Sequence, residues 1–111
     1  MKHFEITFII KPDLNNNLLD SKIEKISKTL TDNEAKIVGT EKWGLRDLAY
    51  SINGLKKGFF IYIQIDIKND KFKEIKNIFN LDEEIVRYLI IKVNNHETLP
   101  SIIMSSQKND S

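Results

Sequence analysis

The chain contains no cysteine, and it has only 2 prolines, 4 glycines and 1 tryptophan. Without cysteine, neither disulfides nor thiolate metal ligands are available. No apolar run approaches the roughly 20 residues of a membrane-spanning helix. The N-terminus also lacks a charged segment followed by a long apolar core, so a secretory signal is not expected. These absences indicate a cytoplasmic protein that folds around an ordinary hydrophobic core.

An excess of charge of one sign is also missing. The chain has 17 basic and 16 acidic residues, for a net charge of +1. Many RNA-binding proteins are far more basic, so a contact with nucleic acid would have to be a local patch. Only two of the basic residues are arginines, Arg46 and Arg87. Because guanidinium groups match phosphate oxygens in geometry, these two are the first candidates for phosphate contacts.

The sequence shows none of the common catalytic patterns. His3 and His96 are distant in the sequence and have no obvious companion ligands, so we predict neither a metal site nor a cofactor. There is no nucleophile elbow, phosphate-cradling glycine loop or HExxH pattern. The acidic triplet at 82–84 is typical of a solvated turn. We therefore predict that the chain is not an enzyme.

Two segments of the first half have a clear periodicity. Residues 2–10 alternate between apolar and polar side chains, as in a half-buried strand. Apolar residues in 19–30 recur at helical spacing and predict an amphipathic helix. Residues 35–43 form a less regular second strand, in which Gly39 suggests a bulge.

The second half repeats this alternation of strand and helix. Turn residues in 53–58 predict a hairpin, and residues 59–67 form the clearest strand of the chain. Asn69 or Asp70 can cap a helix whose apolar side contains Phe72, Ile75, Ile78 and Phe79. The apolar run at 85–93 predicts a final strand in a central position of the sheet.

The order β-α-β-β-α-β predicts an α+β ferredoxin-like sandwich, a four-stranded antiparallel sheet with two helices on one face. At 111 residues, the chain is expected to form one domain over residues 1–93. Residues 94–111 form a polar C-terminal tail that we expect to be flexible until bound. An apolar cluster in this tail, Ile102, Ile103 and Met104, is a candidate docking element for a partner.

The sheet face opposite the helices is expected to be open and to present Phe60, Tyr62 and Gln64. RNA-recognition domains with the same element order stack bases on aromatic residues of this face. Their aromatic-rich motif is missing here. We therefore favour the interpretation that these aromatic residues pair across strands and shield the sheet. An uncovered apolar face also suits a protein partner.

Three separate blocks of the sequence resemble the bacterial small-subunit ribosomal protein six family. The first runs from Met1 to Ile6 and continues as a strand to Lys11-Pro12-Asp13. The second is Trp43-Gly44-Leu45-Arg46-Asp47-Leu48-Ala49-Tyr50, in which Gly44 permits a bend that other residues resist. The third is Ile85 to Lys92, where the family has its last strand. The resemblance implies the same fold that the element order predicts.

The resemblance implies a structural constituent of the small ribosomal subunit that binds the central domain of small-subunit rRNA. It also implies binding together with ribosomal protein eighteen of that subunit, without a small-molecule substrate. The candidate RNA-binding residues are Lys2, Arg46, Tyr50, Lys56, Lys57, Arg87 and Lys92. The candidate partner-binding residues are Trp43, Phe60, Tyr62, Ile102, Ile103 and Met104.

The chain departs from the family pattern at three positions of the second block. Leu45 replaces a frequent arginine, Asp47 a basic or neutral residue, and Ser51 a proline. An acid beside Arg46 can pair with it or weaken its attraction to phosphate. Two other classes remain open: a small regulatory ligand-binding domain of the same fold, and an enzyme of the acylphosphatase type. The latter uses an arginine after the first strand, where this chain has Lys11-Pro12-Asp13.

Overall fold

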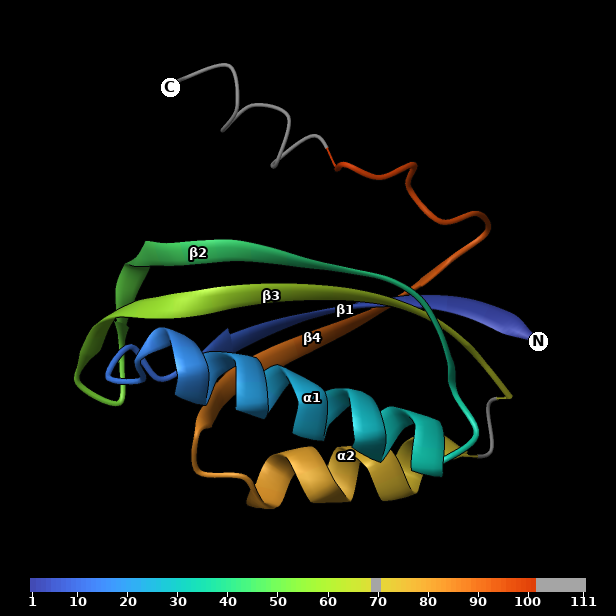
Figure 1. Ribbon diagram of the computed structural model, residues 1–111, viewed down its shortest axis with the longest axis horizontal. Coiled ribbons are helices and arrows are strands. Elements are labelled where there is room, and N and C mark those ends of the chain that lie inside the picture. Colours follow the sequence, from blue (N-terminus) through green and yellow to red (C-terminus); the bar gives the residue numbers. More distant parts are fainter. Residues whose placement is uncertain (69–70, 102–111) are drawn as a thin grey trace.

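The computed structural model describes residues 1–68 and 71–101, and it contains the six predicted elements in the predicted order (Figure 1). The sheet has the strand order β2-β3-β1-β4, and α1 and α2 cover one of its faces. Neighbouring strands are antiparallel. The predicted ferredoxin-like sandwich is therefore confirmed. The elements are β1 (Lys2–Ile10), α1 (Asn16–Asp32), β2 (Lys36–Ile52), β3 (Leu55–Ile67), α2 (Phe72–Leu81) and β4 (Ile85–Val93).

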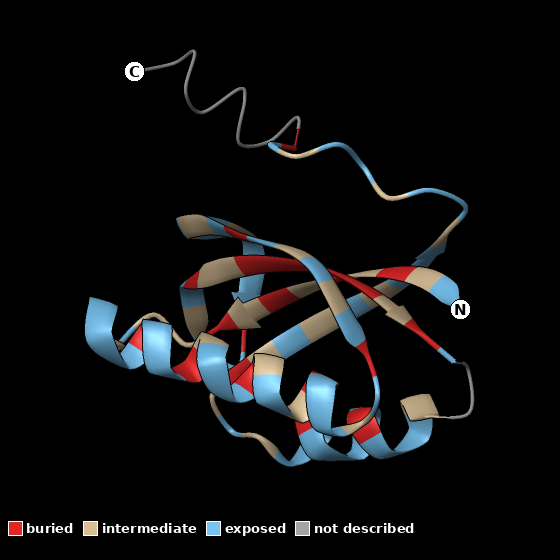
Figure 2. Ribbon diagram, turned by 45° about the vertical axis from the view of Figure 1, so that its right-hand side comes forward, coloured by how far each residue is buried: buried red, intermediate tan, exposed pale blue. Residues whose placement is uncertain are grey.

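The hydrophobic core lies between the helices and the two central strands, β1 and β3. Alternate residues of both strands point toward the helices, so the period-two pattern of the sequence becomes one buried layer (Figure 2). In this layer, β1 and β3 contribute Phe4, Ile6, Phe8, Ile10, Ile61, Ile63, Ile65 and Ile67. The buried apolar residues of the helices are Leu19, Ile26, Leu30, Ile75 and Phe79.

Three details of the second half differ from the prediction. β4 lies at the edge of the sheet, not at its centre. Its apolar run faces both ways: Ile90 packs on the core, whereas Leu89 and Ile91 are exposed on the other face. Ile78 of α2 is also exposed, at the margin of the apolar side. The N-cap of α2 is Lys71, and the predicted caps Asn69 and Asp70 lie outside the described residues.

The β2–β3 hairpin extends beyond the rest of the sheet. Ile10, the last residue of β1, pairs with Phe59, so residues 46–58 continue past β1 as a two-stranded arm, here called the hairpin arm. Its turn is at Asn53 and Gly54, which both have positive φ angles of 51° and 79°. Asn-Gly is a favoured pair for such a turn. Lys56-Lys57-Gly58, predicted as part of the turn, belongs to β3.

Two glycines mark irregularities in β2, as the sequence predicted. The register between β2 and β3 shifts between Ile37 and Gly39 and again between Lys42 and Gly44. Gly44 has a φ angle of 88°, a conformation that side chains with a Cβ disfavour. The second shift lies immediately before the hairpin arm.

A buried lysine joins α1 to the connection between α2 and β4. The amine of Lys22 forms ion pairs with Asp82 and, at 3.1 Å, with Glu84. Burial alone would lower the pKa of Lys22, but hydrogen bonds to both carboxylates outweigh burial and raise the pKa above its usual value. The acidic segment at 82–84 is therefore not only a solvated turn.

Replacing Lys22 with methionine should lower the free energy of unfolding by about 1–2 kcal/mol near pH 7, because two carboxylates lose their partner; their partial exposure limits the loss. The pKa of Lys22 is raised in the folded state. The contribution of the Lys22 ion pairs to the free energy of unfolding is therefore complete below about pH 10, and it disappears as the pH rises past the raised pKa. Urea denaturation at several pH values measures this difference. Lys25→Met, at an exposed position of α1, is the control; an equal loss in both variants would contradict the prediction.

Candidate functional site

The sheet face opposite the helices has a covered end and an open end, although we expected it to be open throughout. Residues 94–101, which follow β4, pass over this face (Figure 1). Gln64 Nε2 donates a hydrogen bond to the carbonyl oxygen of Glu97 at 2.7 Å, and the backbone N–H of Ser101 donates to Glu41 at 2.9 Å. We call residues 94–101 the C-terminal segment. The division of the chain into a body and a flexible tail at residue 93 stays a prediction.

The aromatic pair Trp43 and Tyr62 lies near the covered end. The two rings are stacked, with centroids 5.0 Å apart and an interplanar angle of 16°. Trp43 Nε1 donates to Glu41 at 2.9 Å. Burial raises the pKa of Tyr62, and a hydrogen bond with Glu5 raises it further, so the phenol stays neutral. With 4% of its surface exposed, Tyr62 supports Trp43 in this structure and is not presented to solvent.

The open end of the face is an apolar hollow between β1, β3 and β4. Its lining includes Ile9, Phe60, Leu89 and Arg87. Ile9 is directly opposite both Phe60 and Arg87 in the register, which places these side chains on the same face of the sheet. Leu89 is 58% exposed. The open end is therefore an exposed apolar surface with a cation at its border.

The hairpin arm borders this hollow on one side. A second hollow shares Ile9, Phe60 and Arg87 with the first and includes Tyr50 and other arm residues. Arg87 Nη1 donates to the hydroxyl of Tyr50 at 3.4 Å, which links β4 to the arm. The apolar surface and the basic residues of the arm are thus adjacent.

Arg46 lies at the base of the hairpin arm, and its guanidinium group makes only part of its possible hydrogen bonds. Its Nε donates to the carbonyl oxygen of Trp43 at 3.2 Å, whereas Nη2 is buried and has no acceptor among the described residues. Asp47, the acid that could pair with Arg46 or weaken its attraction to phosphate, lies opposite Lys57 across the hairpin, and their charged atoms are 3.7 Å apart. Asp47 is therefore engaged with the cross-strand lysine.

The structure divides the seven candidate RNA-binding residues into two groups. Arg46, Tyr50, Lys56 and Lys57 lie in the hairpin arm, and Arg87 contacts the arm through Tyr50.

Lys2 and Lys92 form the second group, at the opposite end of β1, roughly 25 Å away by the rise per residue of a strand. They lie opposite Ile67 and Phe4, in the rows that face the helices. The seven residues therefore do not form one compact patch.

The candidate partner-binding residues are also divided. Phe60 lies at the open end, and Trp43 and Tyr62 form the stacked pair near the covered end. Ile102, Ile103 and Met104 lie outside the described residues. Sequence analysis missed Ile9 and Leu89, because only the pairing of β1 with β3 and β4 shows that they share a surface with Phe60.

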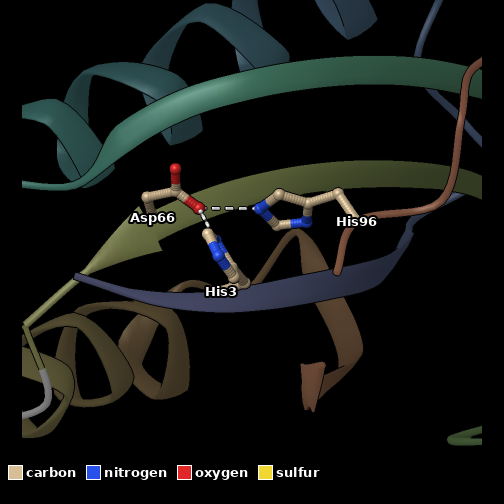
Figure 3. Close-up of side chains that lie close together, drawn as sticks. All are labelled: His3, Asp66 and His96. Carbon is tan, nitrogen blue, oxygen red and sulfur yellow. Dashed lines mark hydrogen bonds and ion pairs between the residues drawn. The ribbon is translucent and has the colours of Figure 1, made fainter. Parts of the chain in front are cut away.

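Sequence analysis found no obvious companion ligands for the two histidines, but the structure brings both of them next to Asp66. Asp66 Oδ1 lies 2.6 Å from His3 Nδ1 and 2.8 Å from His96 Nε2 (Figure 3). Burial acts to raise the pKa of Asp66, but hydrogen bonds from both histidines outweigh it and lower the pKa. His96 reaches this position because the C-terminal segment returns over the sheet. Distance in the sequence therefore did not indicate distance in space.

Neither helix of the described residues is long and apolar enough to cross a membrane.

Two of the most similar relatives are small ribosomal subunit proteins bS6. The protein from Rickettsia prowazekii is 36% identical over 110 residues, which cover 99% of this chain and 91% of that protein. The protein from Cereibacter sphaeroides is also 36% identical over 110 residues, with coverage of 99% and 82%.

Solved structures share the fold. The crystal structure of 30S ribosomal protein S6 from Thermotoga maritima matches with a TM-score of 0.80 and 21% identity, over 99% of this chain and 98% of that one. The C-terminal domain of MgtC from Mycobacterium tuberculosis matches with a TM-score of 0.57 and 8% identity, over 88% of this chain and 94% of that one. At these identities both likenesses show the fold alone.

Fold and surface together define a ferredoxin-like binding module with an apolar sheet end and a basic hairpin arm. The family model described as Ribosomal protein S6 matches residues 3–92. The chain belongs to the ribosomal protein S6 family, which confirms the resemblance seen in the three sequence blocks. It therefore has a structural, non-enzymatic role in the small ribosomal subunit, among rRNA and ribosomal protein partners.

Proposed function

We propose that the chain binds the central domain of small-subunit rRNA together with ribosomal protein eighteen of the same subunit, in the cytoplasm. Membership of the S6 family supports a place in the subunit. The observation that carries the finer proposal is the exposed apolar hollow of Ile9, Phe60 and Leu89 beside the basic hairpin arm. The apolar hollow can pack against a protein and exclude water, while the adjacent hairpin arm binds RNA phosphates.

The hollow suits a protein partner better than stacked bases. Its lining includes the aliphatic residues Ile9 and Leu89 and two aromatic residues, Phe60 and Tyr88, of which Tyr88 packs its ring against Phe8 of the core. Stacking platforms instead present several aromatic rings to successive bases. A leucine or aromatic anchor of the partner would bury Leu89, and burying a leucine side chain contributes about 1.5–3 kcal/mol. Arg87, at the border, is placed to donate hydrogen bonds to a carboxylate or phosphate of the partner.

The hairpin arm is the proposed RNA contact. Lys56 and Lys57 are exposed on β3, and Arg46 lies on β2 at the base of the arm. Nη2 of Arg46 gains an acceptor if the guanidinium turns toward a phosphate oxygen, because the described residues do not supply one. Phosphate contacts of this kind fix position without reading sequence.

Replacing Arg46 with glutamate should weaken the complex with the rRNA fragment and ribosomal protein eighteen by about tenfold or more, since one phosphate contact is lost and a repulsive charge is added. A mobility-shift titration at fixed salt measures the affinity. Lys25→Glu makes the same charge change at an exposed position of α1, on the opposite side of the sheet. Equal affinity of Arg46→Glu and the wild type, or equal weakening by Lys25→Glu, would contradict the assignment of the arm.

A further inference from the structure

Three side chains from distant parts of the chain converge at the covered end of the sheet. His3 comes from β1, Asp66 from β3 and His96 from the C-terminal segment (Figure 3). His3 and Asp66 are direct partners in the β1–β3 register, so the sheet itself fixes two of the three. The rings of His3 and His96 are 5.0 Å apart. Both rings face the same carboxylate oxygen.

The donor atoms match the ligand set of a transition-metal ion. One imidazole nitrogen of each histidine and one oxygen of Asp66 lie within 4.8 Å of one another. Around a tetrahedral zinc ion, ligand atoms at ~2.0–2.1 Å from the metal lie about 3.3 Å apart. The present separations of 2.6 and 2.8 Å would widen by less than about 1 Å as the ion replaces the shared protons.

A second carboxylate orients one of the ligands. Glu5 Oε2 lies 3.3 Å from His96 Nδ1, the ring nitrogen that faces away from Asp66. Glu5 is itself held by the backbone N–H of Glu97 at 3.1 Å and by Gln64 Nε2 at 3.3 Å. A carboxylate on the outer nitrogen of a metal-binding histidine fixes the tautomer and aims the other nitrogen at the ion.

The site is enclosed on one side and accessible on the other. The side chain of His96 is 12% exposed and that of Asp66 18%, whereas that of His3 is 39% exposed. An ion can therefore enter from the side of His3 and keep a water as its fourth ligand. The chain has only 2 histidines and no cysteine, so a site with two imidazole ligands must use this pair.

We propose that His3, Asp66 and His96 form a binding site for a divalent transition-metal ion of the zinc class. Glu5 is a positioning residue that orients His96. Because the three ligands come from β1, β3 and the C-terminal segment, a bound ion fastens that segment to the sheet. The ion has a structural role here and takes no part in a reaction.

The test uses the full-length, untagged and chelator-treated protein at pH 7.5, titrated with zinc chloride in a calorimeter. We expect saturable binding of one ion per chain and an affinity at least tenfold lower in His96→Gln and in His3→Gln. Glu5→Gln should weaken binding by about tenfold through the orientation of His96. Asp47→Asn, which removes an exposed carboxylate of the hairpin arm, should bind like the wild type.

The visible absorption of bound Co²⁺ supplies a second readout. It reports on the ligands of the ion and would not change if the histidines served only to stabilise the fold. Co²⁺ added to the wild type should give visible absorption bands that are absent from His3→Gln. Because the His3 side chain is partly exposed, at 39%, this substitution should leave the fold intact. Circular dichroism verifies the fold of each variant. Absence of saturable zinc binding below millimolar concentration would overturn the proposal, as would equal affinities in the wild type and both histidine variants. The cluster would then be a hydrogen-bonded network only.

Discussion

Replacing Leu89 with aspartate should reduce the affinity for ribosomal protein eighteen by about a hundredfold. Leu89 is the most exposed apolar residue of the hollow formed with Ile9 and Phe60. A partner that covers this surface would lose the burial of a leucine and would also have to bury an unpaired carboxylate. Because Leu89 is 58% exposed in the free protein, its free energy of unfolding should change by no more than about 0.5 kcal/mol.

Isothermal titration of the partner protein into each variant measures this effect. Leu18→Asp is the matched control, because Leu18 is 53% exposed and lies on α1, on the helix side of the sheet. It should bind with the affinity of the wild type. If Leu89→Asp also binds normally, the hollow is not the contact surface. If both variants lose affinity equally, the effect is one of general charge or solubility.

Replacing Phe8 with alanine should lower the free energy of unfolding by about 3–5 kcal/mol, the usual cost of removing a buried phenylalanine. Phe8 is fully buried on β1. Its ring makes an edge contact with Phe79 of α2, with centroids 5.0 Å apart, and a tilted contact with Tyr88 of β4 at 6.4 Å. One substitution therefore removes contacts that join the sheet to a helix and a central strand to an edge strand.

Urea denaturation followed by circular dichroism gives the stability of Phe8→Ala. Phe72→Ala is the comparison, because Phe72 packs on the core but is only partly buried, and it should cost less. A loss below about 1.5 kcal/mol in Phe8→Ala would mean that the site relaxes around the missing ring. A larger loss in Phe72→Ala than in Phe8→Ala would contradict the assignment of the core.

The central strands and both helices were predictable because their signals are local. In residues 2–10 and 59–67, the alternation of side chains is itself the alternation of the two faces of the sheet. The helical spacing of 19–30 likewise gives the side of α1 that packs on the core. Position within the sheet is not local: the apolar run of β4 indicated a central strand, although two of its apolar residues face solvent at an edge.

The candidate site was predicted only in part, for the same reason. Tyr62 and Phe60 were correctly placed on one face, but the sequence could not show that Trp43 stacks on Tyr62 or that Leu89 joins Phe60. Both contacts depend on neighbouring strands and their register. His96 gave no signal at all, because its partners Glu5 and Asp66 belong to strands far away in the sequence.

Sedimentation of a cell lysate tests most directly whether the chain acts as a fixed part of the small ribosomal subunit. A sucrose gradient at moderate salt separates subunits from free proteins, and an antibody against the chain locates it among the fractions. We expect the chain to travel with the small subunit and Arg46→Glu to shift toward the free proteins. A wild-type chain found wholly among the free proteins would contradict this role.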